Sequence, residues 1–272
     1  MRRPPALALV VLALLAFPLH AQARGDQARL SFGLGIGSST SSELWTVRDQ
    51  PMYDNANIDT IIVSRSLRPT LGLVFLATWF PKPRFGLAAE AHLLGLGYED
   101  HCRTTYASGS ARNLAQCRNI NIQTPPGTAA AVTLGGMFRP FPTAGVQPYL
   151  RGNVGLLVTQ QSAVRMRGTT LVPDPETPDP TDSTLADYYV YQDEHPSAIR
   201  PTGAIGVGFT AFVGRSYQTR LELKDNMVLF EQVTRPATFP NEIPDTRNRL
   251  HHVVSLTIGF EVVLEKKRGR RY

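Results

Sequence analysis

Charged side chains stand at alternate positions inside segments that are otherwise apolar. In one such segment, Arg220, Glu222 and Lys224 alternate with two leucines. Successive side chains of a β-strand point to opposite faces, so these charges would share one face of a strand while the leucines cover the other. Charges of both signs at this spacing can pair with charges on neighbouring strands. The chemistry they predict is that of a buried ion-pair cluster.

The same arrangement occurs in three other segments. Glu90, Arg151, Arg220 and Glu222 each lie about four to six residues beyond a short turn, which predicts a similar depth for all of them. We expect Glu90 and Glu222 to pair with Arg151, Arg220 and Lys224, with His92 and Glu261 at the margins. The first interpretation is a structural plug, because unpaired buried charges are costly. The alternative is a gate that rearranges to pass ions.

The sequence offers little support for a catalytic site. His251 and Ser255 share a strand face but stand four residues apart, about 13 Å, which is beyond hydrogen-bond reach. His252 and Ser255 point to opposite faces. The glycines of the 33–37 segment lie within a strand pattern that no helix follows, so they do not form a phosphate-binding loop. We therefore predict no enzymatic activity, no cofactor and no metal centre.

The two cysteines, Cys102 and Cys117, lie in one polar segment, residues 99–127. A disulfide that closes this segment is the favoured interpretation, because oxidising compartments favour disulfides. Two free thiols are an alternative. A zinc site with His101 as a third ligand is a weaker one, since the usual ligand spacing is missing.

The first 23 residues predict export. Arg2 and Arg3 precede an apolar run from Ala6 to Phe17, and Ala21 and Ala23 provide a small-x-small cleavage site. A membrane anchor is the alternative, but the run falls short of the ~20 residues that a spanning helix needs. Residues 1–23 are therefore predicted to be a signal peptide, which agrees with the expected disulfide.

Eight segments alternate apolar and small or polar residues with a period of two. They cover residues 29–38, 70–80, 85–98, 129–138, 149–158, 202–213, 217–230 and 250–264. Short turns and long polar loops alternate between them, which places all long loops at one end. This order predicts an all-β fold, a closed antiparallel eight-stranded up-and-down transmembrane β-barrel with long extracellular loops. A secreted β-sandwich is the alternative.

Two short motifs carry a resemblance to a known family. The stretch from Pro148 to Leu156 is similar to a recurring Pro-Tyr-x-x-x-x-x-Gly strand, and the stretch from Thr257 to Leu264 resembles a final strand recognised by barrel assembly machinery. The mature chain thus resembles small outer membrane barrels of the OmpA and OmpX type. The resemblance implies a Gram-negative outer membrane, a barrel over residues 24–264 and a basic periplasmic tail over residues 265–272.

The expected partners are outer membrane lipid, lipopolysaccharide and the assembly machinery. The net charge of +6 resides in Arg2, Arg3 and the tail, so nucleic acid is not expected. A surface ligand could bind the loops, which hold Trp45 and Tyr53. In the 159–200 loop, divalent cations or a ligand could meet the acidic and tyrosine side chains Asp174, Glu176, Asp179, Asp182, Asp187, Tyr188, Tyr189 and Tyr191. The alternative is that these loops are solvated and flexible.

Overall fold

The structure is a computed structural model that describes most of the chain after residue 29. The described residues are 30–40, 42–54, 57–106, 110–122, 127–173, 183–193, 198–214, 216–239 and 242–264. The predicted signal peptide (1–23) and basic tail (265–272) lie outside the described residues, so both stay predictions.

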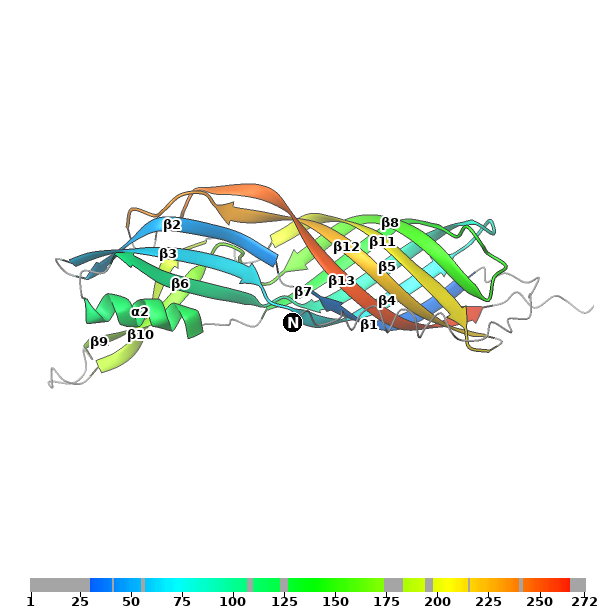
Figure 1. The fold of residues 1–272 in the computed structure, drawn as a ribbon, viewed down its shortest axis with the longest axis horizontal. Coiled ribbons are helices and arrows are strands. Elements are labelled where there is room, and N and C mark those ends of the chain that lie inside the picture. The colour runs from blue at the N-terminus through cyan, green and yellow to red at the C-terminus, as the bar shows by residue number, and fades with distance from the viewer. Residues whose placement is uncertain are drawn as a thin grey trace, which may run out of the picture.

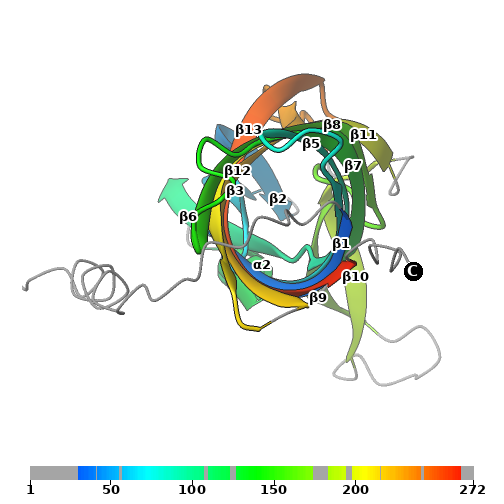
Figure 2. The ribbon, with the colours of Figure 1, turned by 90° about the vertical axis from the view of Figure 1, so that its right-hand side faces the viewer.

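Eight strands form a closed antiparallel barrel in the order β1-β13-β12-β11-β8-β7-β5-β4. Figure 2 looks along the barrel and shows the ring that these strands make. Each of the eight predicted segments overlaps one barrel strand, so the predicted fold is confirmed. The strands are β1 (Leu30–Ser39), β4 (Thr70–Trp79), β5 (Phe85–Gly95), β7 (Thr128–Phe138), β8 (Val146–Thr159), β11 (Ala198–Phe212), β12 (Tyr217–Val233) and β13 (Thr246–Leu264).

The pairing register shows how strongly the strands are staggered. A line of paired residues that starts at Gln147 of β8 and passes once around the barrel returns to β8 at Leu157, ten residues further on. Such a stagger requires the strands to tilt against the barrel axis, by about 35–45° in barrels of this kind. Residues far apart in sequence are thereby brought to one depth.

Three short connections lie at one end of the barrel, which we call the turn end, and four long ones at the other, the loop end. The shortest connection follows β11, where Gly214 has a φ of 140° and Val213 donates its N–H to the carbonyl of Tyr217 at 3.0 Å. Glycine adopts this φ without the steric penalty of a side chain. The connection after β11 is therefore a tight turn, whereas the connections at the loop end are long.

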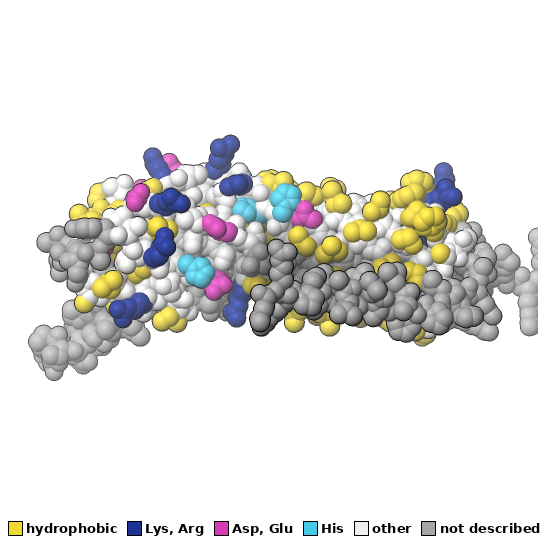
Figure 3. All heavy atoms as spheres, in the orientation of Figure 1, with side chains coloured by type: hydrophobic (Ala, Val, Ile, Leu, Met, Phe, Trp, Pro, Cys, Tyr) yellow, Lys and Arg dark blue, Asp and Glu magenta, His cyan; other side chains and the backbone are white. Residues whose placement is uncertain are grey.

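The outer face of the barrel is a continuous apolar surface. Leu71 is 70% exposed and Val154 is 73% exposed. Figure 3 shows hydrophobic side chains over the barrel and charged ones over the other half of the molecule. Such a large exposed apolar area is what a membrane-spanning barrel presents to hydrocarbon. None of the helices among the described residues has the length and apolar character to span a bilayer.

Aromatic side chains mark the turn end of this surface. Phe85 and Phe138 lie with ring centroids 5.0 Å apart, and Tyr217 and Phe260 stack at 5.3 Å. Each pair joins neighbouring strands. Aromatic girdles at the boundary between hydrocarbon and water are typical of transmembrane barrels.

The described parts of the long connections are folded, so the interpretation as solvated loops does not hold for them, while the acidic stretch 174–182 lies outside the described residues. They form a three-stranded sheet, a helix and a hairpin, which lie at the loop end of the barrel (Figure 1). We call these elements the loop domain. They are β2 (Ser42–Asp54), β3 (Asn57–Leu67), β6 (Tyr98–Tyr106), α2 (Ala111–Ile122), β9 (Met166–Pro173) and β10 (Ser183–Tyr191).

The loop domain has an apolar core of its own. Trp45 of β2 is buried, donates its indole N–H to the carbonyl of Ala163 at 2.9 Å and contacts Tyr191 edge to face at 5.7 Å. Val228 and Phe230 at the loop end of β12 belong to the same core. Trp45 therefore joins separate connections to one another, and the core joins them to the barrel.

A buried ion pair lies inside this domain. Arg65 of β3 donates to both carboxylate oxygens of Asp100 on β6, at 2.6 and 2.7 Å, and to the carbonyl of Ser162 at 3.2 Å. Its guanidinium also faces the rings of Trp45 and Tyr98 at 5.8 and 5.1 Å. The bidentate geometry lets each charge satisfy the other without water. The pair can therefore be buried in the core of this domain.

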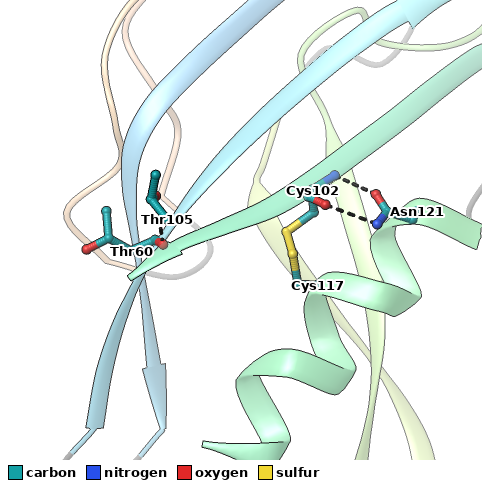
Figure 4. Close-up of a disulfide and its surroundings, with 5 residues drawn as sticks. All are labelled: Thr60, Cys102, Thr105, Cys117 and Asn121. Atoms are coloured by element: carbon teal, nitrogen blue, oxygen red, sulfur yellow. Dashed lines mark hydrogen bonds between the residues drawn. A yellow bond between two sulfur atoms is a disulfide. The ribbon is translucent and has the colours of Figure 1, made fainter. Parts of the chain in front are cut away.

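The predicted disulfide between Cys102 and Cys117 is present. It joins β6 to α2 with a Cα–Cα distance of 5.3 Å. One cysteine thus lies on a strand and the other on a helix, and neither lies in an irregular loop. Figure 4 shows that the Asn121 side chain also holds this strand: it accepts from the Cys102 N–H at 2.5 Å and donates to the Cys102 carbonyl at 3.0 Å. The covalent and hydrogen-bonded links fix one end of α2 to the sheet.

The closed barrel predicts heat-modifiable gel mobility. Unboiled protein in detergent should migrate faster than boiled protein, because the hydrogen-bonded ring stays compact until it is heated. The double substitution Cys102→Ser and Cys117→Ser is the control, and it should keep this shift because the disulfide lies outside the barrel. Identical mobility before and after boiling would overturn the barrel.

A second prediction concerns alkaline stability of the loop domain. Burial raises the pKa of the Tyr98 hydroxyl to about 12, although Arg65 nearby opposes the rise. The unfolded chain therefore ionises first, and stability is lost as the pH rises from 10 to 12. Tyr98→Phe should remove this loss and gain about 1.4 kcal/mol over the wild type at pH 11, with little difference at pH 7. Urea midpoints from Trp45 fluorescence at both pH values test this, and equal midpoints at pH 11 would contradict it.

Candidate functional site: an ion-pair cluster in the barrel lumen

Arg151 of β8 lies at the centre of the lumen between two carboxylates. It donates to Glu90 of β5 at 2.5 Å and also to Glu222 of β12. Lys224 of β12 contacts the other oxygen of Glu90. All four side chains are buried. One guanidinium therefore ties three strands together across the interior.

The network continues towards the turn end. Arg220 donates to Glu222 at 3.2 Å and to Glu261 of β13. Tyr149 donates its hydroxyl to Glu222 at 2.6 Å and lies under the Arg220 guanidinium at 4.7 Å. Ser31 of β1 donates to Glu261 at 2.8 Å. The cluster thus alternates three cations with three carboxylates: Lys224, Glu90, Arg151, Glu222, Arg220 and Glu261.

Glycines on β11 make room for this cluster. A Cβ at Gly206 would lie 2.8 Å from a carboxylate oxygen of Glu222, and one at Gly208 would lie 2.6 Å from the Tyr149 hydroxyl. β11 lies between β8 and β12 in the barrel. The missing side chains on β11 therefore let the long side chains of its two neighbours meet above it.

The structure brings six of the seven predicted residues into direct contact. Glu261, expected at the margin, pairs directly with Arg220. His92 is buried beside the cluster, and its Nε2 atom has no hydrogen-bond partner among the described residues. His92 therefore lies at the margin of the cluster, outside the ion pairs.

His92 borders a small cavity on the loop side of the cluster. The cavity measures about 50 Å³, and its lining includes Glu90, Asn226 and Ser255 together with the apolar side chains of Leu157 and Phe230. The lining is mostly apolar, with a few polar groups near Glu90 and His92. On the loop side the cluster is thus bordered by this small cavity and then by the core of the loop domain.

An apolar group closes the lumen on the other side. Phe80, Ala88, Met137 and Tyr149 form a buried cluster near the turn end. Arg139 is buried against Phe80, with its guanidinium carbon 3.7 Å from the ring centroid. These residues were not predicted as part of the site. The alternation around Leu150 sets Tyr149 on the same face as Arg151, but nothing in the sequence marks Arg139, which follows the last residue of β7.

The residues considered for catalysis and metal binding are dispersed. Ser255 accepts a hydrogen bond from Asn226 at 2.9 Å, and His252 lies on the outer face, 2.7 Å from Asp225. His251 lies 3.0 Å from the amide nitrogen of Gln232. No group of three metal-ligating side chains occurs in the described part of the chain. The side chains of Asp174, Glu176, Asp179, Asp182 and Asp187 lie outside the described residues.

Removal of the central guanidinium should weaken the barrel strongly. Arg151→Ala leaves Glu90 and Glu222 without their shared cation, and breaking a buried pair in this way costs about 3–5 kcal/mol. The matched control is Arg235→Ala, which removes an exposed pair with Asp245 and should cost at most about 1 kcal/mol. The temperature at which the gel mobility shifts measures both effects. Equal shifts for the two variants would contradict this account of the cluster.

Comparison with known proteins gives distant likenesses in structure and none in sequence. No family model matches the chain, and no curated protein matches it. Neisserial surface protein A has 8% identity and a TM-score of 0.40, covering 89% of this chain and 100% of its own. Ail of Yersinia pestis has 11% identity and a TM-score of 0.40, covering 88% and 99%. OprG of Pseudomonas aeruginosa has 12% identity and a TM-score of 0.42, covering 90% and 100%.

Likenesses with such low sequence identities and TM-scores indicate neither the activity nor the partners of this chain. The fold assignment rests on the strand order and register of the chain itself, which close a ring of eight antiparallel strands. In that feature, together with its apolar outer face, the chain resembles the small eight-stranded outer membrane β-barrels.

Proposed function

We propose that this protein is a surface-interaction barrel of a Gram-negative outer membrane, with a lumen plugged by charge pairs. The observation that carries the proposal is the combination of an apolar outer face with a lumen filled by six mutually paired charges. The first suits a hydrocarbon environment, and the second supports a lumen without an open path. The remaining surface of the molecule that meets water at the loop end is the loop domain.

Several features support export to this location. Residues 1–23 have the parts of a signal peptide, and the disulfide belongs to an oxidising compartment. The stretch from Thr257 to Leu264 forms the turn-end part of β13 and would be the segment that the assembly machinery recognises. With the turn end in the periplasm, the basic tail that follows Leu264 begins there and the loop domain faces the outside.

The loop domain suits a role in surface contact because its shape is fixed internally. Tyr191 donates to the side chain of Gln50 at 2.7 Å, which in turn accepts from the Ala237 N–H at 2.8 Å. This network joins three of the long connections. Near it, Phe239 is 67% exposed and Ile243 is 54% exposed. Exposed apolar side chains on a rigid support are typical of contact surfaces, and they favour a non-catalytic binding role.

A second candidate function is a narrow channel for ions or small solutes. The cavity beside His92 and the unpartnered Nε2 of that residue among the described residues favour it, because a cavity already reaches Glu90 from the loop side. Opening would then require that the ion pairs rearrange, together with the apolar contacts around Phe230 at the loop end and around Phe80 at the turn end.

Planar-bilayer recordings separate the two candidates. If the lumen is plugged, the wild type should show no conductance, and neither should Glu222→Gln, because the side chains of the variant still fill the lumen. For a gate, Glu222→Gln should raise conductance while the gel mobility shift shows that the barrel stays closed. Glu231→Gln is the matched control, since it changes a carboxylate on β12 that pairs with Arg200 beyond the cluster. Mass spectrometry of lipid A after expression tests the absence of a lipid-modifying activity.

A further inference from the structure

Arg139, at the turn end of the lumen, is a buried cation that no described carboxylate balances. Its side chain is 2% exposed, and the Phe80 ring covers one face of its guanidinium at 3.7 Å. Guanidinium N–H groups radiate in the plane of the group, so a ring against the face leaves them free. Nε and one terminal nitrogen of Arg139 have no hydrogen-bond partner among the described residues. A buried cation in this state is costly unless an anion reaches those N–H groups.

The buried charges of the described lumen do not cancel. Four cations stand against three carboxylates, which leaves one positive charge in excess. Each cation of the cluster contacts a carboxylate, whereas Arg139 makes no ion pair with a described residue. The excess charge is therefore that of Arg139. The charges counted are those of Arg139, Arg151, Arg220 and Lys224 against Glu90, Glu222 and Glu261.

A second guanidinium and a hydroxyl group lie near Arg139. Arg220 is within electrostatic range of Arg139, and one of its terminal nitrogens has no hydrogen-bond partner among the described residues. Thr210 of β11 pairs with Arg220 in the register of β11 and β12. Its side chain is fully buried, and its hydroxyl also has no described partner. Directly opposite residues have Cβ atoms about 4.5–5.5 Å apart, so this hydroxyl is within side-chain reach of the Arg220 guanidinium.

We propose that one small monovalent anion of the halide class binds at the turn end of the lumen, between Arg139 and Arg220, with the Thr210 hydroxyl as a further donor. Two guanidinium groups that repel each other are stabilised by an anion between them. A single negative charge cancels the excess of one, and the free N–H and O–H groups supply its hydrogen bonds. Water could satisfy those groups but would leave the charge. The site lies on the turn side of the cluster, so it goes beyond the proposed surface role and does not depend on it.

Thermal unfolding of the full-length mature protein in a neutral detergent tests the proposal. Chloride replaces gluconate at constant ionic strength, and circular dichroism follows the strands. The wild-type midpoint should rise by about 5–10 °C once chloride reaches about 100 times its dissociation constant. Arg139→Met should abolish this rise and, in gluconate, unfold at a temperature at least as high as the wild type. Lys82→Met is the matched control, because Lys82 is an exposed cation in the turn between β4 and β5 and should leave the rise unchanged.

A pair of substitutions at Thr210 tests the charge itself. Thr210→Asp supplies a negative charge from the chain next to Arg220, so its midpoint should no longer depend on chloride. Thr210→Asn has nearly the same shape without the charge, and its midpoint should still rise with chloride. The two variants differ only in one charge at the proposed site. They carry the test on their own if Arg139→Met does not fold.

The outcomes decide between a bound anion and its alternatives. A wild-type midpoint that is equal in chloride and gluconate overturns the site in favour of water alone. A rise that persists in Arg139→Met, or that Lys82→Met loses to the same degree, overturns it in favour of a general effect of salt on the surface. Equal chloride dependence of Thr210→Asp and Thr210→Asn overturns the role of the charge. The gel mobility shift is measured on the same samples, so failure of the barrel itself is seen separately.

Discussion

The structure depends on one constraint, which is that the interior of a narrow closed barrel has to be filled and electrically balanced. Eight strands leave a lumen only wide enough for side chains. Here long charged side chains fill it, and each carboxylate touches at least one cation. Because a buried charge without a partner costs several kcal/mol, the cluster is an all-or-none arrangement. Its members on β5, β8, β12 and β13 therefore hold the ring together from inside.

The same constraint explains the residues that carry no charge. Glycines on β11 leave the space that Glu222 and Tyr149 occupy. On β5 the inward positions hold Glu90 and His92, while the outward positions 89 and 91 hold alanines. Two shallow hollows on the outer face lie over this strand, one bordered by Ala89 and Ala91 and the other by Leu93. Interior filling and exterior shape are thus set by two interleaved series of residues on one strand.

The loop domain, outside the barrel, is also held together by buried polar links. Besides its apolar core, it has a bidentate pair between Arg65 and Asp100, a disulfide and hydrogen bonds through Gln50. These links join connections that leave the barrel at different strands. The membrane-embedded part and the loop domain meet in a shared core around Phe230, so the barrel serves as a rigid base for the surface above it.

The sequence by itself determined the eight barrel strands, the direction of their faces, the disulfide partners and the residues of the lumenal cluster, because a period of two is a local property of each segment. Which cation each carboxylate contacts, including the pair of Arg220 with Glu261, was decided only by the tertiary structure, since the stagger of the barrel sets their depth. Arg139 and the loop domain also escaped prediction. β2 carries two register shifts, and Asp49 within the second one has a φ of 59°, so the alternation of the strand is interrupted. Such strands are stabilised by packing against α2, β12 and β13, and that packing is a long-range contact that no local pattern records.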